Sequence, residues 1–203
     1  MSAFFERPVL AGRQVRLEPL TLDHVDGLRA ALGDPGVWTW IHVNQPADRR
    51  QMRAFVSDLL ARQQDRTQVT WAQIDAATGE VAGITAYQDI VPKDRGLGIG
   101  ATFLGPRWQR TGVNTEAKLM LLERAFDTLG VIRVGWTTHH GNLRSQRAIE
   151  RLGAQRDGVL RNHKIMPDGS VRHSVVYSMI DSEWPAARDA LRARLRAYGP
   201  PAV

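Results

Sequence analysis

The sequence predicts a single α/β (α+β) domain in which a mixed, twisted sheet of about seven strands is flanked by helices. Two observations predict this fold class. Strand-like and helical segments alternate through the middle of the chain, and pairs of strand-like segments joined by short turns stand on either side of that middle part. The chain has 203 residues, of which 43% are hydrophobic, which suits one well-buried core and is short for two typical domains. We therefore expect one domain over residues 1–203, with its core at about residues 13–198.

The chain begins with an expected strand and two expected helices. Residues 15–20 are typical of a strand and lead into a helix capped by Thr21. A longer helix follows Asp48, because apolar residues recur there at i, i+3, i+4, i+7 and i+8, namely Met52, Phe55, Val56, Leu59 and Leu60. The other face of this helix carries Arg49, Arg50, Arg53 and Arg62. Such a stripe predicts a helix with one face packed on a sheet.

Three strands are expected next. Residues 67–74 and 81–90 are strand-like, and the segment between them, residues 75–79, ends in Gly79 and suits a hairpin loop. A polar break at 92–96 then precedes a short strand at 98–104.

The second half of the chain alternates between helix and strand. We expect a helix at 115–129, ended by Gly130, then a strand at 132–138 and a short helix at 145–152 closed by Gly153. Strands at 159–165 and 172–180 flank a strong turn signal at 166–170. A last helix starts near Asp181 with Pro185 in its first turn, and it aligns Trp184, Leu191, Leu195 and Tyr198.

Composition excludes several classes of protein. There is no cysteine, so disulfides, cysteine-based zinc sites and a thiol nucleophile are excluded. The formal charge of +6 suits an anionic ligand, but arginines alternate with acids along most of the chain, as on a solvated surface, so nucleic acid is not the expected partner. No apolar run approaches the ~18 residues of a membrane span, and the first residues lack an apolar signal core. We expect a cytoplasmic protein without a membrane partner.

Two patterns are poor candidates for a site. The glycines at 96, 98 and 100 suggest a dinucleotide loop, but they follow a polar turn and open a strand rather than a helix. His139 and His140 suggest a metal, but no ligand stands at a suitable spacing, and neighbouring strand residues point to opposite faces. We expect no metal site.

Two other stretches are candidates for binding. Residues 106–117 join an expected strand to an expected helix, where backbone N–H groups and the positive end of the helix dipole can meet an anion. Gly112 permits close approach and Arg110 adds a charge; a plain connecting loop is the alternative. Asn142 and Ser145 follow the strand at 132–138, where Asn142 can bond a ligand amide or simply cap the next helix.

The order of these motifs resembles that of the GNAT N-acetyltransferases, specifically their RimJ/RimL-like branch. In that family a strand is followed by Gln/Arg-x-x-Gly-x-Gly/Ala and then a helix, and residues 109–114 stand in this place. The branch continues with Ala-Phe near the helix end, a strand, Asn-x-x-Ser and Leu-Gly. These motifs correspond to Ala125 and Phe126, Asn142 to Ser145, and Leu152 and Gly153. The likeness covers about residues 15–195.

The resemblance implies a GNAT fold in which two parallel strands, here 99–104 and 132–138, splay apart to form an acetyl-CoA cleft. Pantetheine would bond the backbone of Phe103 and Leu104, and Arg110 to Asn114 would hold the pyrophosphate. The implied cofactor-binding residues are Phe103, Leu104, Gln109, Arg110, Thr111, Gly112, Val113, Asn114, Asn142, Ser145 and Arg147. The arginine-striped helix after Asp48 would help to form the acceptor side.

The activity implied by the resemblance is transfer of an acetyl group from acetyl-CoA, as cosubstrate, to a primary amine. We expect direct transfer in a ternary complex, with Asn142 and Ser145 as the catalytic residues. Backbone N–H groups of the first splayed strand would stabilise the oxyanion, and Ser145 would protonate the departing thiolate.

The chain departs from the family pattern at four places. Gly98 stands where relatives carry a glutamate base, and Ile149 stands where they carry a tyrosine acid. The loop ends in Asn114 rather than Gly or Ala, and His173 follows Arg172 where Asp is common. For the missing base, Asp89, His139 and a chain of waters remain alternatives.

Without a dedicated general base, the enzyme is expected to favour an acceptor amine that is already partly neutral at pH 7. An α-amine has a pKa of about 8 and a lysine side chain about 10.4, and one unit is worth roughly 1.4 kcal/mol. We therefore expect a protein N-terminal α-amine, ribosomal proteins included, or a small amine or aminosugar. A catalytically weak or inactive acyl-CoA-binding regulator, and an RNA- or ribosome-binding protein, are the other hypotheses. The acceptor, the acyl length and the oligomeric state, a homodimer included, stay open.

Overall fold

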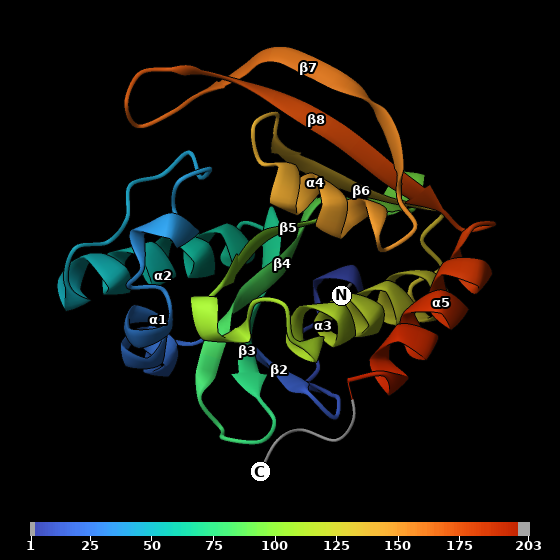
Figure 1. Cartoon of the computed structure of the whole chain (residues 1–203), viewed down its shortest axis with the longest axis horizontal. Helices are drawn as coiled ribbons and strands as arrows, with labels where there is room; N and C mark the ends of the chain where they lie inside the picture. The colour runs from blue at the N-terminus through green and yellow to red at the C-terminus, as the bar shows by residue number, and fades with distance from the viewer. Residues whose placement is uncertain (1–2, 199–203) are drawn as a thin grey trace.

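The computed structural model describes residues 3–198, which fold around one eight-stranded mixed sheet (Figure 1). The two ends of the expected domain at 1–203 lie outside the described residues. In spatial order the strands are β1 (Leu10–Ala11), β2 (Val15–Pro19), β3 (Gln68–Asp75), β4 (Val81–Val91), β5 (Gly96–Leu104), β6 (Arg133–His139), β8 (Val171–Ile180) and β7 (Gln155–Ile165). The sheet has one strand more than the expected seven, because the two-residue β1 pairs with β2. The α/β class is confirmed.

Five α-helices cover this sheet. They are α1 (Val25–Ala31), α2 (Arg49–Gln64), α3 (Gly112–Glu123), α4 (Leu143–Glu150) and α5 (Trp184–Arg196). Short 3₁₀ helices lie at Ala3–Phe5, Leu22–His24, Pro35–Val37, Pro92–Asp94 and Pro106–Trp108, and a π-helical turn at Arg124–Thr128 extends α3.

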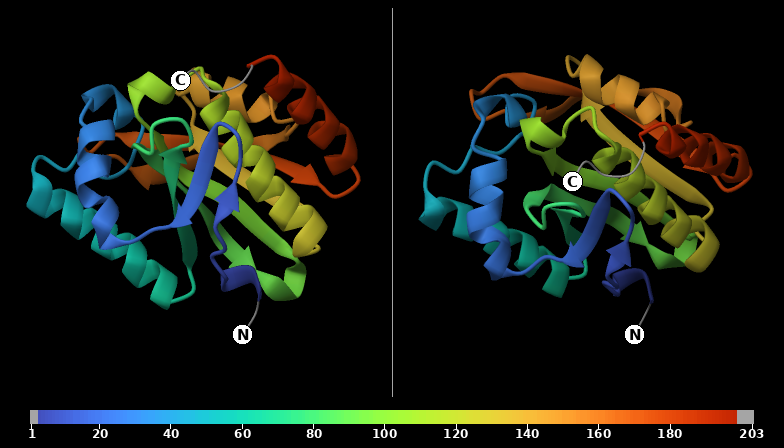
Figure 2. Two further views of the ribbon diagram at one scale, coloured as in Figure 1. Left: turned by 90° about the horizontal axis from the view of Figure 1, so that it is seen from below. Right: turned by 60° about the horizontal axis from the view of Figure 1, so that its bottom comes forward.

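The helices divide between the two faces of the sheet (Figure 2). On β4, the Tyr87 hydroxyl donates to the carbonyl of Leu121 in α3, whereas on β5 the ring of Phe103 packs against Phe55 in α2, with ring centroids 5.6 Å apart. On β8, the Tyr177 hydroxyl donates to Glu150 in α4 at 2.9 Å. Because Tyr177 lies on the same face as Tyr87 by sheet register, α3, α4 and α5 cover one face and α1 and α2 the other.

Several expected boundaries differ from the structure. The helix expected at 115 begins at Gly112, because Thr111 caps it and accepts a hydrogen bond from the Val113 N–H at 3.3 Å. The strand expected at 159 begins at Gln155. Tyr198 does not share the apolar face of the last helix: α5 ends at Arg196, and the Tyr198 side chain is 39% exposed. The predicted cap Thr21 is confirmed, and the helix expected after Asp48 begins at Arg49, with Asp48 accepting from the Gln51 N–H at 2.7 Å.

A buried carboxylate fixes the start of α3 against the first strands. Glu116 is 8% exposed and accepts hydrogen bonds from the backbone N–H groups of Arg13 at 2.9 Å, Gln14 at 2.5 Å and Val15 at 2.9 Å. Gly12 is required beside it, because a Cβ there would lie 2.3 Å from Oε2 of Glu116. The β1–β2 turn thus holds the helix end at which the expected binding loop lies.

Candidate functional site

The central feature of the sheet is the parting of β5 and β6. These parallel strands share three register pairs, Gly96 with Arg133, Leu97 with Val134 and Gly98 with Gly135. Beyond them β5 continues beside β4 to Leu104, and β6 continues beside β8 to His139. The predicted splayed pair is therefore confirmed. It opens a cleft of about 1060 Å³, large enough for a sizeable ligand.

A β-bulge shapes the β5 wall of the cleft. Ala101 has a φ of 44°, and the register with β4 shifts at this point. The extra residue turns the Thr102 side chain towards α3. The Phe103 carbonyl lies against β4, since a Cβ on Gly83 would be 1.9 Å from its oxygen. The Leu104 carbonyl faces the other way, because it accepts a hydrogen bond from Gln109 Nε2 at 2.9 Å. Of the two residues expected to bond pantetheine through the backbone, Leu104 thus directs its carbonyl away from β4.

The loop before α3 carries the features of an anion site. Arg110 is exposed and has a φ of 64°, so the chain turns sharply just before the helix. The N–H groups of Gly112 and Asn114 occupy the first turn of α3, where no intrahelical partner exists and the helix dipole is positive. Among the described residues, the buried Asn114 Oδ1 has no hydrogen-bond partner. The free N–H groups of this turn can donate to a phosphate, and the unpaired Asn114 Oδ1 can accept a hydrogen bond from an amide N–H of the same ligand.

Gly112 has a packing role as well. A Cβ on Gly112 would lie 2.9 Å from Cγ of Gln14, so a larger residue would displace that side chain before it reached any ligand. Substitution of Gly112 is therefore a poor test of anion binding.

Gln109 joins the two arms of the cleft. Its amide nitrogen donates to the Leu104 carbonyl on β5, and its Oε1 accepts a hydrogen bond of 2.6 Å from Arg144 in α4. Arg144 stands next to Ser145, so this pair of bonds links the end of β5 to the start of α4 across the mouth of the cleft.

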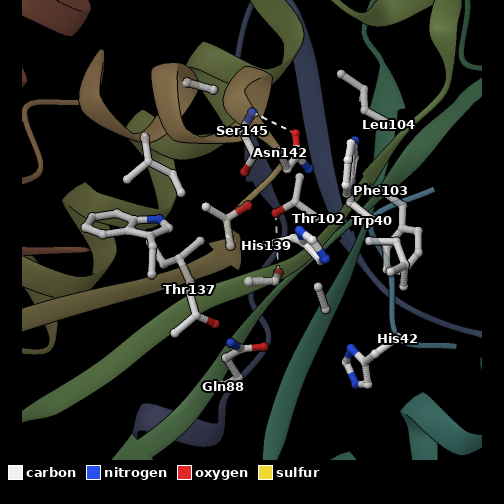
Figure 3. A pocket seen from close by; sticks show the side chains of 18 of the residues that line it. Trp40, His42, Gln88, Thr102, Phe103, Leu104, Thr137, His139, Asn142 and Ser145 are labelled. Carbon is white, nitrogen blue, oxygen red and sulfur yellow. Dashed lines mark hydrogen bonds between the residues drawn. The ribbon is translucent and has the colours of Figure 1, made fainter. Parts of the chain in front are cut away.

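The other arm ends in Asn142 and the first turn of α4 (Figure 3). Asn142 Oδ1 accepts the Ser145 N–H at 3.0 Å, so its interpretation as a helix cap is confirmed. Ser145 uses its backbone for this cap, which leaves its hydroxyl facing the cleft that Ser145, Arg147 and Ile149 line. Ile149 is buried.

His139 has its acceptor nitrogen occupied. Its Nδ1 accepts the Gly141 N–H at 2.9 Å, and its ring packs against Trp40 with centroids 4.8 Å apart. Burial, followed by the neighbouring His140 and Arg172, lowers the pKa of His139, so its imidazole is neutral with the proton on Nε2. The rings of His139 and His140 stack at 4.4 Å. The expectation that they point to opposite faces is wrong, because β6 ends at His139 and strand alternation stops there.

Asp89 lies where the expected glutamate is missing. It has a φ of 50°, and its Oδ2 lies 3.3 Å from the position that a Cβ on Gly98 would take. Asp89 also lines the cleft. A carboxylate from β4 therefore occupies the space above Gly98 that a side chain on β5 would otherwise fill.

Lys118 is a cleft residue that the sequence did not reveal. It is 5% exposed, and its Nζ donates to the Thr85 hydroxyl at 2.7 Å and the Thr102 hydroxyl at 2.6 Å. It follows Asn114 by one helical turn, so both face the cleft from α3. The sequence signal that could have indicated it is a lysine among the apolar residues of the expected helix at 115–129. Burial lowers its pKa to about 7.

Metal-ligating clusters and membrane-spanning helices are both absent from residues 3–198. No group of three or more His, Cys, Asp or Glu is placed to hold a metal ion within this range. No helix in the same range has the length and apolarity to cross a membrane.

The chain is similar in sequence and in structure to known acetyltransferases. The family model for the acetyltransferase (GNAT) domain matches residues 14–155. The chain is 22% identical over 173 residues to the uncharacterized N-acetyltransferase YoaA of Bacillus subtilis (strain 168), covering 85% of this chain and 97% of that protein. A GCN5-related N-acetyltransferase from Brucella melitensis has a similar structure, with a TM-score of 0.88, 35% identity, and coverage of 94% of this chain and 86% of the other.

A ribosomal-protein-S5-alanine acetyltransferase from Vibrio fischeri has the same fold. The TM-score is 0.71 at 13% identity, covering 87% of this chain and 98% of that chain. At that identity the likeness extends to the fold alone.

The buried Lys118 makes stability depend on pH in a defined direction. Its pKa is 10.5 in an unfolded chain and about 7 in the folded protein, so between these values the unfolded chain binds more protons at this position. The free energy of unfolding therefore rises with pH in this window and is unaffected below it. Relative to a Lys118→Met variant, the wild type should gain roughly 2 kcal/mol from pH 7 to pH 9, measured by urea unfolding.

The exposed Lys93 provides the matched control for this measurement. Lys93→Met should leave the pH dependence of the wild type unchanged. Parallel pH curves for the wild type and Lys118→Met would contradict the neutral, buried state of Lys118.

Proposed function

This chain belongs to the GNAT acetyltransferase family, and from that premise we propose that it transfers the acetyl group of acetyl-CoA directly to a primary amine in a ternary complex. The observation that supports the proposal best is the parting of β5 and β6 beside the start of α3. It places an orphaned amide oxygen, a helix N-terminus and Arg110 along one continuous cleft. No cysteine is present to carry an acyl intermediate, which favours direct transfer.

The start of α3 would bind the phosphates of the cosubstrate. We assign the pyrophosphate to Arg110 and to the backbone N–H groups of Gly112 and Asn114, while Thr111 and Val113 shape the turn through their own hydrogen bond. The pantetheine arm would run along β5, with the Leu104 carbonyl and the Asn114 amide as polar partners. Asn142 and Arg147 would contact it from the α4 side.

The transfer forms a C–N bond and breaks the C–S bond of the thioester. The attacking amine must lose one proton, and the departing thiolate must gain one. We assign the second role to Ser145, whose hydroxyl faces the cleft and takes no part in the α4 cap. The β5 bulge at Ala101 would aim a backbone N–H at the developing oxyanion.

Asp89 is a better candidate than His139 for the general base that takes the proton from the amine. The lone pair on Nδ1 of His139 is occupied by the Gly141 N–H, and the remaining ring nitrogen carries a proton. Asp89 presents a carboxylate above Gly98 at the point where the strands part. We therefore propose Asp89 as the general base, acting directly or through one water.

Two classes of acceptor suit this chemistry. A small amine or aminosugar, or a protein N-terminal α-amine as in the RimJ/RimL-like branch, would be partly neutral near pH 7. Release of coenzyme A thiol in the presence of a pool of such amines tests the activity. Binding of acetyl-CoA without turnover would identify the chain as an acyl-CoA-binding regulator instead.

Arg110→Gly tests the cosubstrate assignment. Glycine keeps the positive φ of 64° and removes the side chain that carries the guanidinium. The Kd for acetyl-CoA, measured by calorimetric titration, should rise by about tenfold or more, because a charge-assisted hydrogen bond is lost. Arg95→Gly is the matched control, since Arg95 has a φ of 48° at the opposite end of β5. Equal affinities in the two variants would refute the assignment.

Asp89→Asn tests the base. Asparagine tolerates the φ of 50°, so the fold should persist while kcat falls by about 10²-fold or more. The rate of the variant should keep rising with pH to about 8, the free amine's own pKa, whereas the wild-type rate levels off earlier. Asp94→Asn, in the short connection that follows β4, should retain full activity. An unchanged pH profile in Asp89→Asn would assign the base elsewhere.

Ser145→Ala tests the proton donor. Because the α4 cap uses the Ser145 backbone, stability and acetyl-CoA affinity should stay close to those of the wild type. The turnover number should fall by about 10²-fold or more, measured by thiol release. A loss smaller than about threefold would leave Ser145 with its backbone role only.

A further inference from the structure

Arg172 is a buried cation that faces the cleft without a carboxylate partner. It lies on β8, five residues from Tyr177, so regular alternation places it on the α2 face of the sheet. Its side chain lines the cleft, the residue is 6% exposed, and its Nε donates to the Ser174 hydroxyl at 3.0 Å. Among the ion pairs formed within residues 3–198, none includes Arg172.

A second cation stands directly opposite. Lys164 on β7 is the register partner of Arg172 and also lines the cleft, and like charges in this position destabilise a sheet. Its Nζ lies 3.5 Å from Nε2 of His42. Nearby Arg62 is already paired with Asp58 at 2.8 Å, and Asp89 opposes Lys164 only at longer range.

Burial and the positive charge of Lys164 and Arg172 lower the pKa of two neighbouring histidines, His42 and His163. Partial burial, and then Lys164 and Arg172, lower the pKa of His42 to about 4. The pKa of His163 is lowered by burial and by the same two cations. The histidines therefore stay neutral at physiological pH, so the net charge here comes from Lys164 and Arg172. A buried, unpaired guanidinium is costly in a folded protein, which points to a ligand that offsets the cost.

This cationic pair is separate from the loop assigned to the cosubstrate phosphates. Arg110 and Asn114 lie at the start of α3, whereas Lys164 and Arg172 lie on the α2 face, and the cleft between β5 and β6 connects the two sides. The ligand on the α2 face is therefore the acceptor rather than coenzyme A.

A loop also spans the α2 side of the cleft. The loop between α1 and α2 reaches the end of β6 and the β7–β8 hairpin through two contacts (Figure 1). Trp40 packs on His139, and His42 meets Lys164. A space bridged by these two contacts suits a small molecule better than the end of a folded protein.

We propose that the acceptor is a small amine bearing an oxyanion, a carboxylate or a phosphate group, which Arg172 and Lys164 bind on the α2 side of the cleft. This inference rests on the proposed acetyl transfer. With the oxyanion held there, Asp89 is the carboxylate that faces the ammonium end of the same molecule.

Matched amines test the specificity. The pairs are 2-aminoethyl phosphate with ethanolamine, and β-alanine with β-alaninamide. In the wild type the anionic member of at least one pair should have a kcat/KM about tenfold higher or more, and Arg172→Met should abolish that preference while the KM for acetyl-CoA is unchanged. The pair that responds identifies phosphate or carboxylate as the group bound. Equal kcat/KM values within both pairs would overturn the proposal.

Binding of an oxyanion to Arg172 can also be tested without turnover, through the melting temperature of the protein. Inorganic phosphate, added to protein saturated with coenzyme A, should raise the melting temperature of the wild type and of Arg161→Met, an exposed-arginine control on β7. It should not do so in Arg172→Met, which should itself be as stable as the wild type or more so without phosphate, because the like-charge pair is relieved.

A purely structural Arg172 predicts the opposite pattern. Arg172→Met would then lower the melting temperature and leave the response to phosphate intact, and this result would overturn the proposal. Failure of acetyl-CoA binding is reported separately by the titration with Arg110→Gly, so the two proposals fail by different measurements.

Discussion

The site depends on the early end of pairing between β5 and β6. Every other neighbouring pair of the sheet is antiparallel, and the longer strands pair along most of their length. At this one boundary the backbone groups beyond Gly98 and Gly135 lose their ladder partner. Unpaired backbone groups inside a sheet are costly, so the opening persists because other elements hold its two walls apart.

Three features supply that support. On one wall the bulge at Ala101 sends Thr102 to α3, where Lys118 joins it to Thr85. On the other wall Asn142 caps α4 against the end of β6. Gln109 then ties the two walls together at the mouth through Leu104 and Arg144. Since these contacts are polar, they preserve the separation without filling the cleft with apolar side chains.

The sequence predicted the features of the site that are local in the chain. Helix and strand order, the cap Thr21, the helix after Asp48, the loop before α3 and the Asn142–Ser145 pair each depend on residues a few positions apart. The features that it left open or missed depend on register. Nothing in the order of residues places Asp89 above Gly98, because that needs the bulged pairing of β4 with β5. Arg172 and Lys164 face each other only once the β7–β8 pairing, with its two irregularities, is fixed.

Lys118 and Arg172, the two buried basic residues of the cleft, differ in whether they can lose their proton near neutral pH. Lys118 can release its proton near neutral pH, because burial lowers its pKa to about 7, and its partners are two uncharged threonine hydroxyls. Arg172 cannot be deprotonated in the physiological range, and its Nε donates to the uncharged Ser174 hydroxyl. The α3 side of the opening therefore carries a charge that can be lost near neutral pH, while the α2 side keeps a fixed positive charge. In the proposed reaction the uncharged thioester would suit the first environment, and an anionic acceptor would suit the second. This asymmetry would orient the two proposed substrates towards each other across the gap between β5 and β6.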